Sequence, residues 1–225
     1  KVTPEDIKRV ANKYLGTEKA AISIVLPEDA KDVKISTVTP NVKKPEFVSA
    51  QGGSEKYNLA NNATLVLTPN NSNEIVAISI FAKGGNFIEP KKGTANLTAA
   101  TMLKGTNKYT SQELAEILED NGIKIEPSVR SDAFTVTVLT TTQQYEKTLE
   151  LLNEVLNNAT FSEYELDKVK NDKLNAIKKS RDIPLNVALE GYKHLIFAGT
   201  PYSNSTIDLE KNIPNITRDE IVSYY

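Results

Sequence analysis

Histidine and cysteine, the residue types that most often bind zinc or act as nucleophiles, are nearly missing from this sequence. Its 225 residues include a single histidine, His194, and no cysteine. A zinc site with several imidazole ligands, a thiolate metal site and a cysteine nucleophile are therefore all impossible within this chain. His194 is followed by Leu195 and Ile196 and has no clustered carboxylates beside it, which favours an ordinary helix side chain.

The charged clusters are better explained by helix ends than by a reactive site. The acidic residues within 163–167 follow Ser162 at the predicted start of a helix, where carboxylates stabilise the positive end of the helix dipole. The basic residues within 178–181 lie near the predicted end of the same helix, where positive charge is favourable. Neither cluster predicts a metal or catalytic site.

Residues 93–106 form a segment of small residues that ends in Lys104, Gly105 and Thr106. The segment reads GTANLTAATMLKGT and follows a hairpin sequence, LANNATLVL at 59–67, and a strand sequence, AKGGNFIEP at 82–90. In this order the three segments resemble the insulinase/pitrilysin/mitochondrial-processing-peptidase family of zinc metallopeptidases, whose active members read G-x-A-H-x-x-E-H-x-x-x-K-G-T. The frame is kept by five residues: Gly93, Ala95, Lys104, Gly105 and Thr106.

The zinc-binding positions of that motif carry no ligands here. Two histidines four residues apart lie on one face of a helix and can bind one zinc ion, while the adjacent glutamate polarises a zinc-bound water. In this chain the positions are Asn96, Ala99 and Ala100. The family's third ligand is a glutamate on a later helix, but residues 171–177 hold only one carboxylate, Asp172. The resemblance therefore implies no catalytic residue, no metal ligand and no cofactor in this fragment.

The resemblance also implies a protein in two parts. Family members have two homologous halves that close around a chamber, and in single-chain members one half has lost the zinc motif. We therefore expect the parent to be a zinc metalloendopeptidase whose zinc is bound by the other half. This chain would be the inactive, non-catalytic half, which shapes the closed chamber that holds the peptide substrate. The alternative is a structural or peptide-binding family member with no active half.

Gly84 and Gly85 have two alternative roles. Because glycine has no side chain, the pair could let a peptide approach the edge of a sheet. A plain turn between a strand and the following helix accounts for the same two residues, and both interpretations stay open at this point.

The apolar patterns predict strands first and long helices afterwards. Strands are expected at 63–68, 75–82, 123–126 and 133–140, and helices at 93–103, 142–157, 163–180 and 184–197. Thr110 and Glu113 form a capping-box sequence before one further helix. This order predicts an α+β fold like that of a processing-peptidase half, with an antiparallel sheet over about residues 57 to 140 packed by helices on one face. The wholly apolar face of 75–82 predicts a central strand.

Three segments are predicted along the chain. Residues 1–26 resemble the closing helix and strand of a preceding repeat unit, and they are expected to lie outside the main core. Residues 27–55, with three prolines and charges of both signs, are predicted to be a linker. Residues 56–225 would be the degenerate peptidase-like domain, truncated at its C-terminal end, because VTPEDI near the start returns as ITRDEI at 216–221.

The charge balance and hydropathy exclude two classes of partner. Lys and Arg total 27 and Asp and Glu total 29, so the net charge of -2 gives no general attraction for nucleic acid or an anionic membrane. No stretch of the sequence approaches the roughly 20 apolar residues of a membrane-spanning helix. The expected partners are a peptide substrate and the remaining parts of the same polypeptide.

Overall fold

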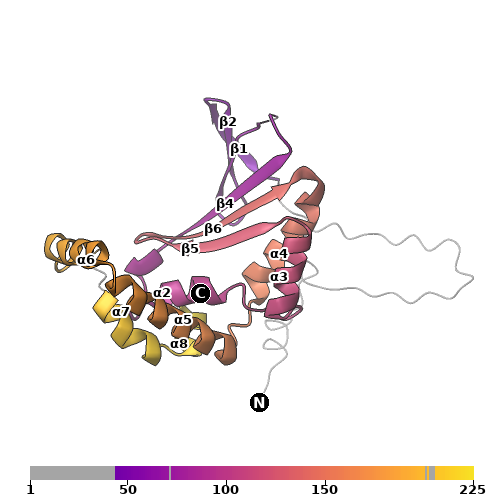
Figure 1. The fold of residues 1–225 in the computed structure, drawn as a ribbon. Coiled ribbons are helices and arrows are strands. Elements are labelled where there is room, and N and C mark those ends of the chain that lie inside the picture. The colour runs from indigo at the N-terminus through magenta and orange to yellow at the C-terminus, as the bar shows by residue number, and fades with distance from the viewer. Residues whose placement is uncertain (1–43, 71, 201, 203–205) are drawn as a thin grey trace, which may run out of the picture. The chain divides into compact units, whose positions relative to one another are not determined.

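The computed structural model describes residues 44–70, 72–200, 202 and 206–225, and Figure 1 shows the ribbon. The chain divides into two compact units, Lys1–Asn71 and Ser72–Tyr225. The helix and strand predicted within residues 1–26 lie outside the described residues, and so does most of the predicted linker. The placement of residues 1–26 outside the main core therefore stays a prediction.

The described part of the first unit is a small antiparallel sheet. Its strands, in the order β1-β2-β3, are β1 (Glu46–Gln51), β2 (Ser54–Asn58) and β3 (Thr64–Leu67). Gly52 and Gly53 connect β1 to β2 with φ angles of 59° and 82°, a left-handed turn that glycine adopts without strain. The segment 27–55, predicted as a linker, therefore contains strand from Glu46 onward. The division between linker and domain stays a prediction.

The second unit contains a three-stranded antiparallel sheet. Its strands, in the order β4-β6-β5, are β4 (Ile75–Lys83), β5 (Lys124–Val129) and β6 (Ala133–Thr141). The apolar face predicted for 75–82 is the more buried face of β4, because Val76, Ile78 and Ile80 are half-buried between exposed neighbours. Its predicted central position is wrong, since β6 is the middle strand of this sheet. Alternation shows which face of a strand is buried, but it does not show how many strands pair with it.

Helices gather on one face of the β4-β6-β5 sheet (Figure 1). They include α2 (Thr94–Thr101), α3 (Ser111–Asp120), α4 (Tyr145–Asn158) and α5 (Glu163–Arg181). Leu97, Val138 and Val155, from α2, β6 and α4, are completely buried in the core between the two layers. The predicted α+β fold with antiparallel strands is confirmed. The strands expected in one sheet form two three-stranded sheets, one in each unit.

Side-chain caps set several helix boundaries. Thr110 Oγ1 accepts a hydrogen bond from Glu113 N at 3.2 Å, and Glu113 Oε2 accepts one from Thr110 N at 2.9 Å. The predicted capping box before α3 is thus confirmed. Ser162 Oγ accepts a hydrogen bond from Glu165 N at 3.3 Å at the start of α5. These bonds satisfy N–H groups that the first turn of a helix otherwise leaves free.

The C-terminal segment completes the helical layer. It contains α6 (Pro184–Ile196), α7 (Thr206–Asn212) and α8 (Arg218–Tyr224). Helix α8 packs against α2, and Ile216 and Ile221 are 1% and 0% exposed there. Arg218 donates hydrogen bonds to the carbonyl oxygens of Phe161 and Thr160, each at 3.0 Å. Helix α2 is thereby fixed among β5, α5 and α8.

Short 3-10 helices join some of these elements. They are η2 (Gly85–Phe87), η3 (Thr142–Gln144) and η4 (Ile213–Asn215). The helices predicted at 163–180 and 184–197 are confirmed to within one residue at each end. In the part of the chain that the structure describes, no helix combines the length and the apolar character that crossing a bilayer requires.

Candidate functional site

Helix α2 carries the positions of the zinc motif, and the chain before it fixes its first turn. Gly93, the residue before the helix, has a φ of 105° and offers no capping side chain. The side chain of Glu89 caps the helix instead, because Glu89 Oε2 accepts hydrogen bonds from Gly93 N at 3.0 Å and Ala95 N at 3.1 Å. A side chain at position 93 would also come within 3.2 Å of Leu209. Glu89 and Gly93 together therefore set the start of α2.

The carboxyl group of Glu89 is half-buried, and this burial raises its pKa above the ordinary value of 4.5. The hydrogen bonds from Ala95 and Gly93 and the nearby charge of Lys92 lower the pKa, but they only partly offset the burial. The second oxygen, Oε1, is buried without a hydrogen-bond partner among the described residues. Glu89 is therefore a structural cap whose carboxyl group has a raised pKa.

Asn96, Ala99 and Ala100 lie on one face of α2 but offer no ligand set for zinc. Asn96 is half-buried, and its Nδ2 donates to Asn86 Oδ1 over a long 3.4 Å. Ala99 is buried and Ala100 is half-buried. One amide and two methyl groups can neither hold a zinc ion nor take a proton from water. Across the described residues, no three His, Cys, Asp or Glu side chains are grouped for metal binding.

The segment expected to hold the third ligand lies on α5 and is equally unsuited. Asp172, its single carboxylate, is exposed, and so are Asn171 and Lys173. Leu174 and Ile177 contribute to the core instead. Because α5 packs directly against α2, the two helices that a zinc site would need are neighbours. The scaffold of such a site is present, and its ligand side chains are missing.

A pocket of about 500 Å³ lies beside these positions, between α2 and β5. Ala99 and Ala100 form part of its wall, and its charged lining residues are Lys104 and Glu126. Pro127 also lines it and lies in β5, the edge strand, where proline has no N–H to offer to a further strand. The arrangement provides space and apolar contact beside the zinc-motif positions.

Gly84 and Gly85 pack against the turn between β5 and β6. Gly85 is buried, and a side chain there would collide with Arg130 O and with Ala133 N. Its carbonyl oxygen accepts a hydrogen bond from the Tyr224 hydroxyl at 3.0 Å. Gly84 has a φ of 135°, which side chains rarely tolerate. These contacts support the turn role, and a peptide contact at this pair stays a prediction.

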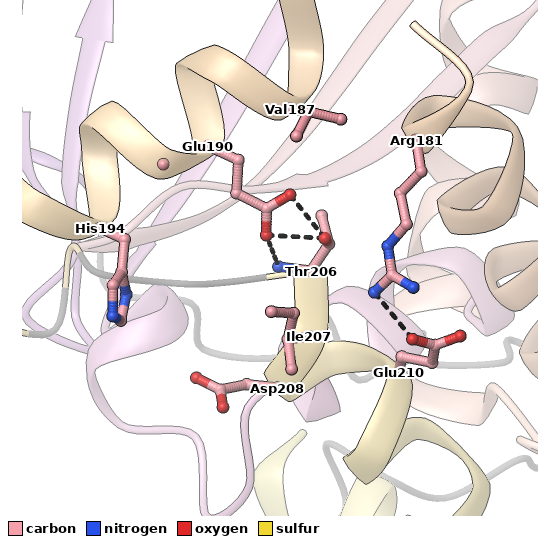
Figure 2. Close-up of a pocket in the computed structure, with 9 residues that line it drawn as sticks. Arg181, Val187, Glu190, His194, Thr206, Ile207, Asp208 and Glu210 are labelled. Atoms are coloured by element: carbon pink, nitrogen blue, oxygen red, sulfur yellow. Dashed lines mark hydrogen bonds and ion pairs between the residues drawn. The ribbon is translucent and has the colours of Figure 1, made fainter. Parts of the chain in front are cut away.

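A second pocket, of about 670 Å³, lies between α6 and α7 and is shown in Figure 2. His194 is exposed and lines it, together with Gly191 of the same helix. Sequence reasoning missed this pocket because its lining comes from three helices, α5, α6 and α7, which only the fold brings together. The one local signal was a glycine inside a predicted helix, which lowers helix stability unless something else requires it.

The profile of the family described as Insulinase (Peptidase family M16) matches residues 65–210. The chain belongs to this family. The match runs from β3 into α7, so it includes α2, β5 and the helices around both pockets. The resemblance drawn from the motif frame is thereby confirmed.

Curated relatives of this insulinase-family chain are distant and longer. Cytochrome b-c1 complex subunit 1 from Caenorhabditis elegans mitochondria is 26% identical over 162 residues, which cover 71% of this chain and 34% of the relative. The non-peptidase homolog YmxG of Helicobacter pylori is 25% identical over 147 residues, which cover 64% of this chain and 34% of that relative. The chain thus spans about a third of the length of these relatives.

Solved structures share the fold at low sequence identity. The peptidase M16 inactive domain from Pseudomonas fluorescens matches with a TM-score of 0.70 at 19% identity, covering 76% of this chain and 42% of that one. The periplasmic protease PqqL from Escherichia coli matches with a TM-score of 0.67 at 15% identity, and the match covers 98% of this chain and 24% of PqqL. At such identities the likeness concerns the fold alone.

The motif residues that this insulinase-family chain keeps have packing roles. Gly105 has a φ of 132°, and a side chain there would come within 3.3 Å of Thr160 Oγ1. Thr106 is buried, and its Oγ1 accepts hydrogen bonds from Lys108 N at 3.2 Å and Tyr109 N at 3.0 Å. Gly105 and Thr106 therefore serve the fold.

Proposed function

We propose that this chain is the non-catalytic half of a two-half zinc metallopeptidase of the insulinase family. The observation that carries the proposal is helix α2. It keeps its cap and its packing against α5 and α8, yet it presents Asn96, Ala99 and Ala100 where hydrolysis needs two imidazoles and a carboxylate. A motif helix that keeps its position in the fold but has no zinc ligands favours a role in binding, through the protein surface, and not in zinc-dependent hydrolysis.

The relatives support a role without catalysis. One relative is named a non-peptidase homolog, and one solved structure is described as an inactive domain of a peptidase. Because this chain spans about a third of the length of its relatives, the remaining part of a longer polypeptide would supply the half with an intact zinc motif.

In this role the chain would form one wall of a chamber that holds a peptide. The pocket between α2 and β5 gives that wall an apolar recess beside a strand edge, with Lys104 and Glu126 as its charged groups. Apolar recesses beside exposed strand edges hold extended peptides through side-chain and main-chain contacts. Pro127 removes one N–H from this edge, so side-chain contacts would contribute most of the binding.

A structural role in a protein without any active half is the second candidate. It is favoured by one relative, which is named as a subunit of the cytochrome b-c1 complex. The two candidates differ in what they require of this surface. A chamber wall binds peptide, whereas a purely structural subunit has no need to do so.

The test combines peptide cleavage and peptide binding on the same purified chain. We expect no cleavage of a quenched fluorescent peptide in the presence of added zinc, but saturable binding of that peptide in a polarisation titration. Cleavage that a chelator abolishes would contradict the proposal. Absence of any binding would favour the structural alternative.

A further inference from the structure

Helix α6 carries a row of large apolar side chains on its surface. Leu185, Leu189, Tyr192 and Ile196, here called the apolar stripe, are 66%, 48%, 60% and 54% exposed. Leu195, which lies beside the stripe, is 80% exposed. None of the 13 residues of α6 is buried, and the helix lies at the end of the helical layer (Figure 1). Proteins rarely leave so many neighbouring apolar side chains in water unless the surface binds a partner.

The apolar stripe lies on the side of α6 that faces away from α7. Val187, Glu190 and His194 line the pocket that α6 forms with α7 (Figure 2). With about 3.6 residues per helical turn, these three residues and the four residues of the stripe fall on opposite sides of the helix. Contacts with α7 therefore account for one side of α6 and leave the stripe unexplained.

The spacing along the stripe matches that of a helix that pairs with another helix. Its residues follow one another at intervals of four, three and four, the spacing of the apolar seam between paired helices. These intervals are the same when they are read from either end. A second copy of α6 that runs in the opposite direction therefore presents a matching row, in which Leu185 faces Ile196 and Leu189 faces Tyr192. A two-fold symmetric contact requires this kind of self-complementarity.

The charged residue beside the stripe favours the same antiparallel direction. Lys193 is exposed and directly follows Tyr192. In a parallel pair the two Lys193 side chains would lie level with each other and repel. In an antiparallel pair they lie toward opposite ends of the contact, and the dipoles of the two helices oppose each other favourably. Spacing and charge thus favour one arrangement.

We propose that two copies of this chain form a symmetric dimer in which their apolar stripes pair as antiparallel helices. A second copy supplies the matching row without any other protein, and the stripe itself carries no charge that the contact would bury. The inference goes beyond the proposed function and does not depend on peptide binding.

The exposed apolar surface is sufficient for a weak dimer. A specific interface buries at least about 1,000 Å² in total over both partners. The stripe and Leu195 provide five side chains from each copy, so each side chain would contribute about 100 Å². Beyond the end of α6, Phe197 contacts Tyr202 with ring centroids 5.8 Å apart, and Tyr202 contacts Phe87 at 5.0 Å. These partly exposed rings add apolar surface, and we expect association at tens of micromolar.

Sedimentation equilibrium of the whole 225-residue chain measures the association. One chain has a mass of 24.8 kDa, and we expect the mass of wild type to approach twice this value as the concentration rises. Leu189→Glu places a carboxylate near the middle of the stripe, so it should weaken association about tenfold or more. Leucine and glutamate have similar helix propensities, and circular dichroism checks that the variant folds. His194→Glu adds the same charge to the opposite side of α6 and is the matched control, with no expected change.

A mixing experiment tests the antiparallel alignment. Tyr192→Lys alone should also weaken self-association. When it is mixed with Leu189→Glu, the introduced ammonium and carboxylate groups would face each other in the dimer, so the mixture should associate about tenfold more tightly than either variant alone. The control mixture combines Leu185→Lys with Leu189→Glu. Its two introduced charges would lie about two helical turns apart, and we expect no gain.

The outcomes decide the inference separately from the proposed function. A wild-type chain that stays monomeric up to about 100 μM would overturn it and would leave the stripe to another domain of the longer polypeptide. Equal weakening by Leu189→Glu and His194→Glu would also overturn it, because the effect would then not belong to the stripe. Equal behaviour of the two mixtures would overturn the proposed pairing. Peptide binding is measured in a separate titration, so none of these results decides the peptide-holding function.

Discussion

Glu89 determines where helix α2 begins, because its carboxylate replaces the capping side chain that Gly93 lacks. Its contribution is separate from the zinc chemistry, since its hydrogen bonds come from the backbone of the frame residues Gly93 and Ala95 and not from the three zinc positions. A cap of this kind contributes about 1 kcal/mol. The residue therefore gives a measure of how firmly the chain still holds the helix that would carry the zinc motif.

Glu89→Ala is expected to lower the free energy of unfolding by about 1–2 kcal/mol near neutral pH. The N–H groups of Gly93 and Ala95 lose their shared acceptor at the start of a largely buried helix. Urea unfolding measures the change. The control is Glu119→Ala on the exposed surface of α3, with an expected loss below about 0.5 kcal/mol. Equal losses in the two variants would contradict the capping role.

Glu89→Gln tests the pH dependence of the same group. Burial raises the pKa of Glu89 above 4.5, so the folded state binds the proton more tightly than the unfolded state. The stability that this group contributes is complete below its unfolded pKa and is lost as the pH rises through the folded one. We therefore expect wild type to lose stability relative to Glu89→Gln in urea unfolding as the pH rises above the ordinary pKa of 4.5. A difference that does not vary with pH would contradict this.

Restoring the motif with Asn96→His, Ala99→Glu and Ala100→His is expected to give at most weak zinc binding. Two imidazoles would be supplied, but Asp172 is exposed on α5 and the nearby segment has no glutamate to complete the site. Isothermal titration with a zinc salt measures the affinity, with wild type as the reference. Tight stoichiometric binding by the triple variant would show that some other side chain completes the site.

The absence of zinc-binding side chains at the motif positions could be predicted from the sequence, because the identity of each side chain is a local property. The cap by Glu89 and the pocket around His194 could not. Glu89 contacts the start of α2 because of the conformation of residues 89–93, and the pattern of apolar residues does not predict that conformation. The pocket depends on α5, α6 and α7 meeting in space, and its lining residues are unremarkable in their own segments.

At the scale of elements, α8 packs against α2 and completes the core. Its first turn has a capping box between Thr217 and Glu220, with the Glu220 carboxylate accepting from Thr217 N at 2.9 Å. Lys91 forms an ion pair with Glu220 at 2.7 Å, and it holds the pKa of that carboxyl below its usual range. Ile221 then enters the core completely. The last helix of the chain is thus part of the structure that holds α2.

Ile221→Ala is expected to lower the free energy of unfolding by about 2–5 kcal/mol, because it leaves a cavity where α8 meets α2. Val222→Ala on the same helix is the matched control, since Val222 is 44% exposed and loses little contact. Thermal or urea unfolding of both variants measures the difference. Similar losses in the two would mean that α8 does not pack on the core as described.

Local signals predicted elements better than their arrangement. The capping boxes and the apolar faces of 163–180 and 184–197 depend on neighbours along the chain, and these helices were found with nearly correct ends. The position of β4 in its sheet depends on strands more than forty residues away, and its alternation gave no information about them. The hairpin that begins at Glu46 was missed because it lies in a segment whose prolines and mixed charges suggested a linker.

At the scale of the whole molecule, the chain combines an insulinase-family fold with a motif helix that offers no set of zinc ligands. The two helices that would share a zinc ion, α2 and α5, are still packed together. Two of the pockets in the second unit lie on the α2–β5 side and between α6 and α7. This combination fits a surface that holds peptide for another half to cleave.

Zinc analysis of the purified chain tests the central claim most directly. The chain would be dialysed against a chelator, then against buffer with trace zinc, and its metal content would be measured by mass spectrometry. We predict far less than one zinc per chain, because carboxylates without imidazole or thiolate partners bind zinc weakly and without selectivity. One zinc per chain that survives the chelator, and that disappears in an Asn96→Ala variant, would contradict the assignment of this half as non-catalytic.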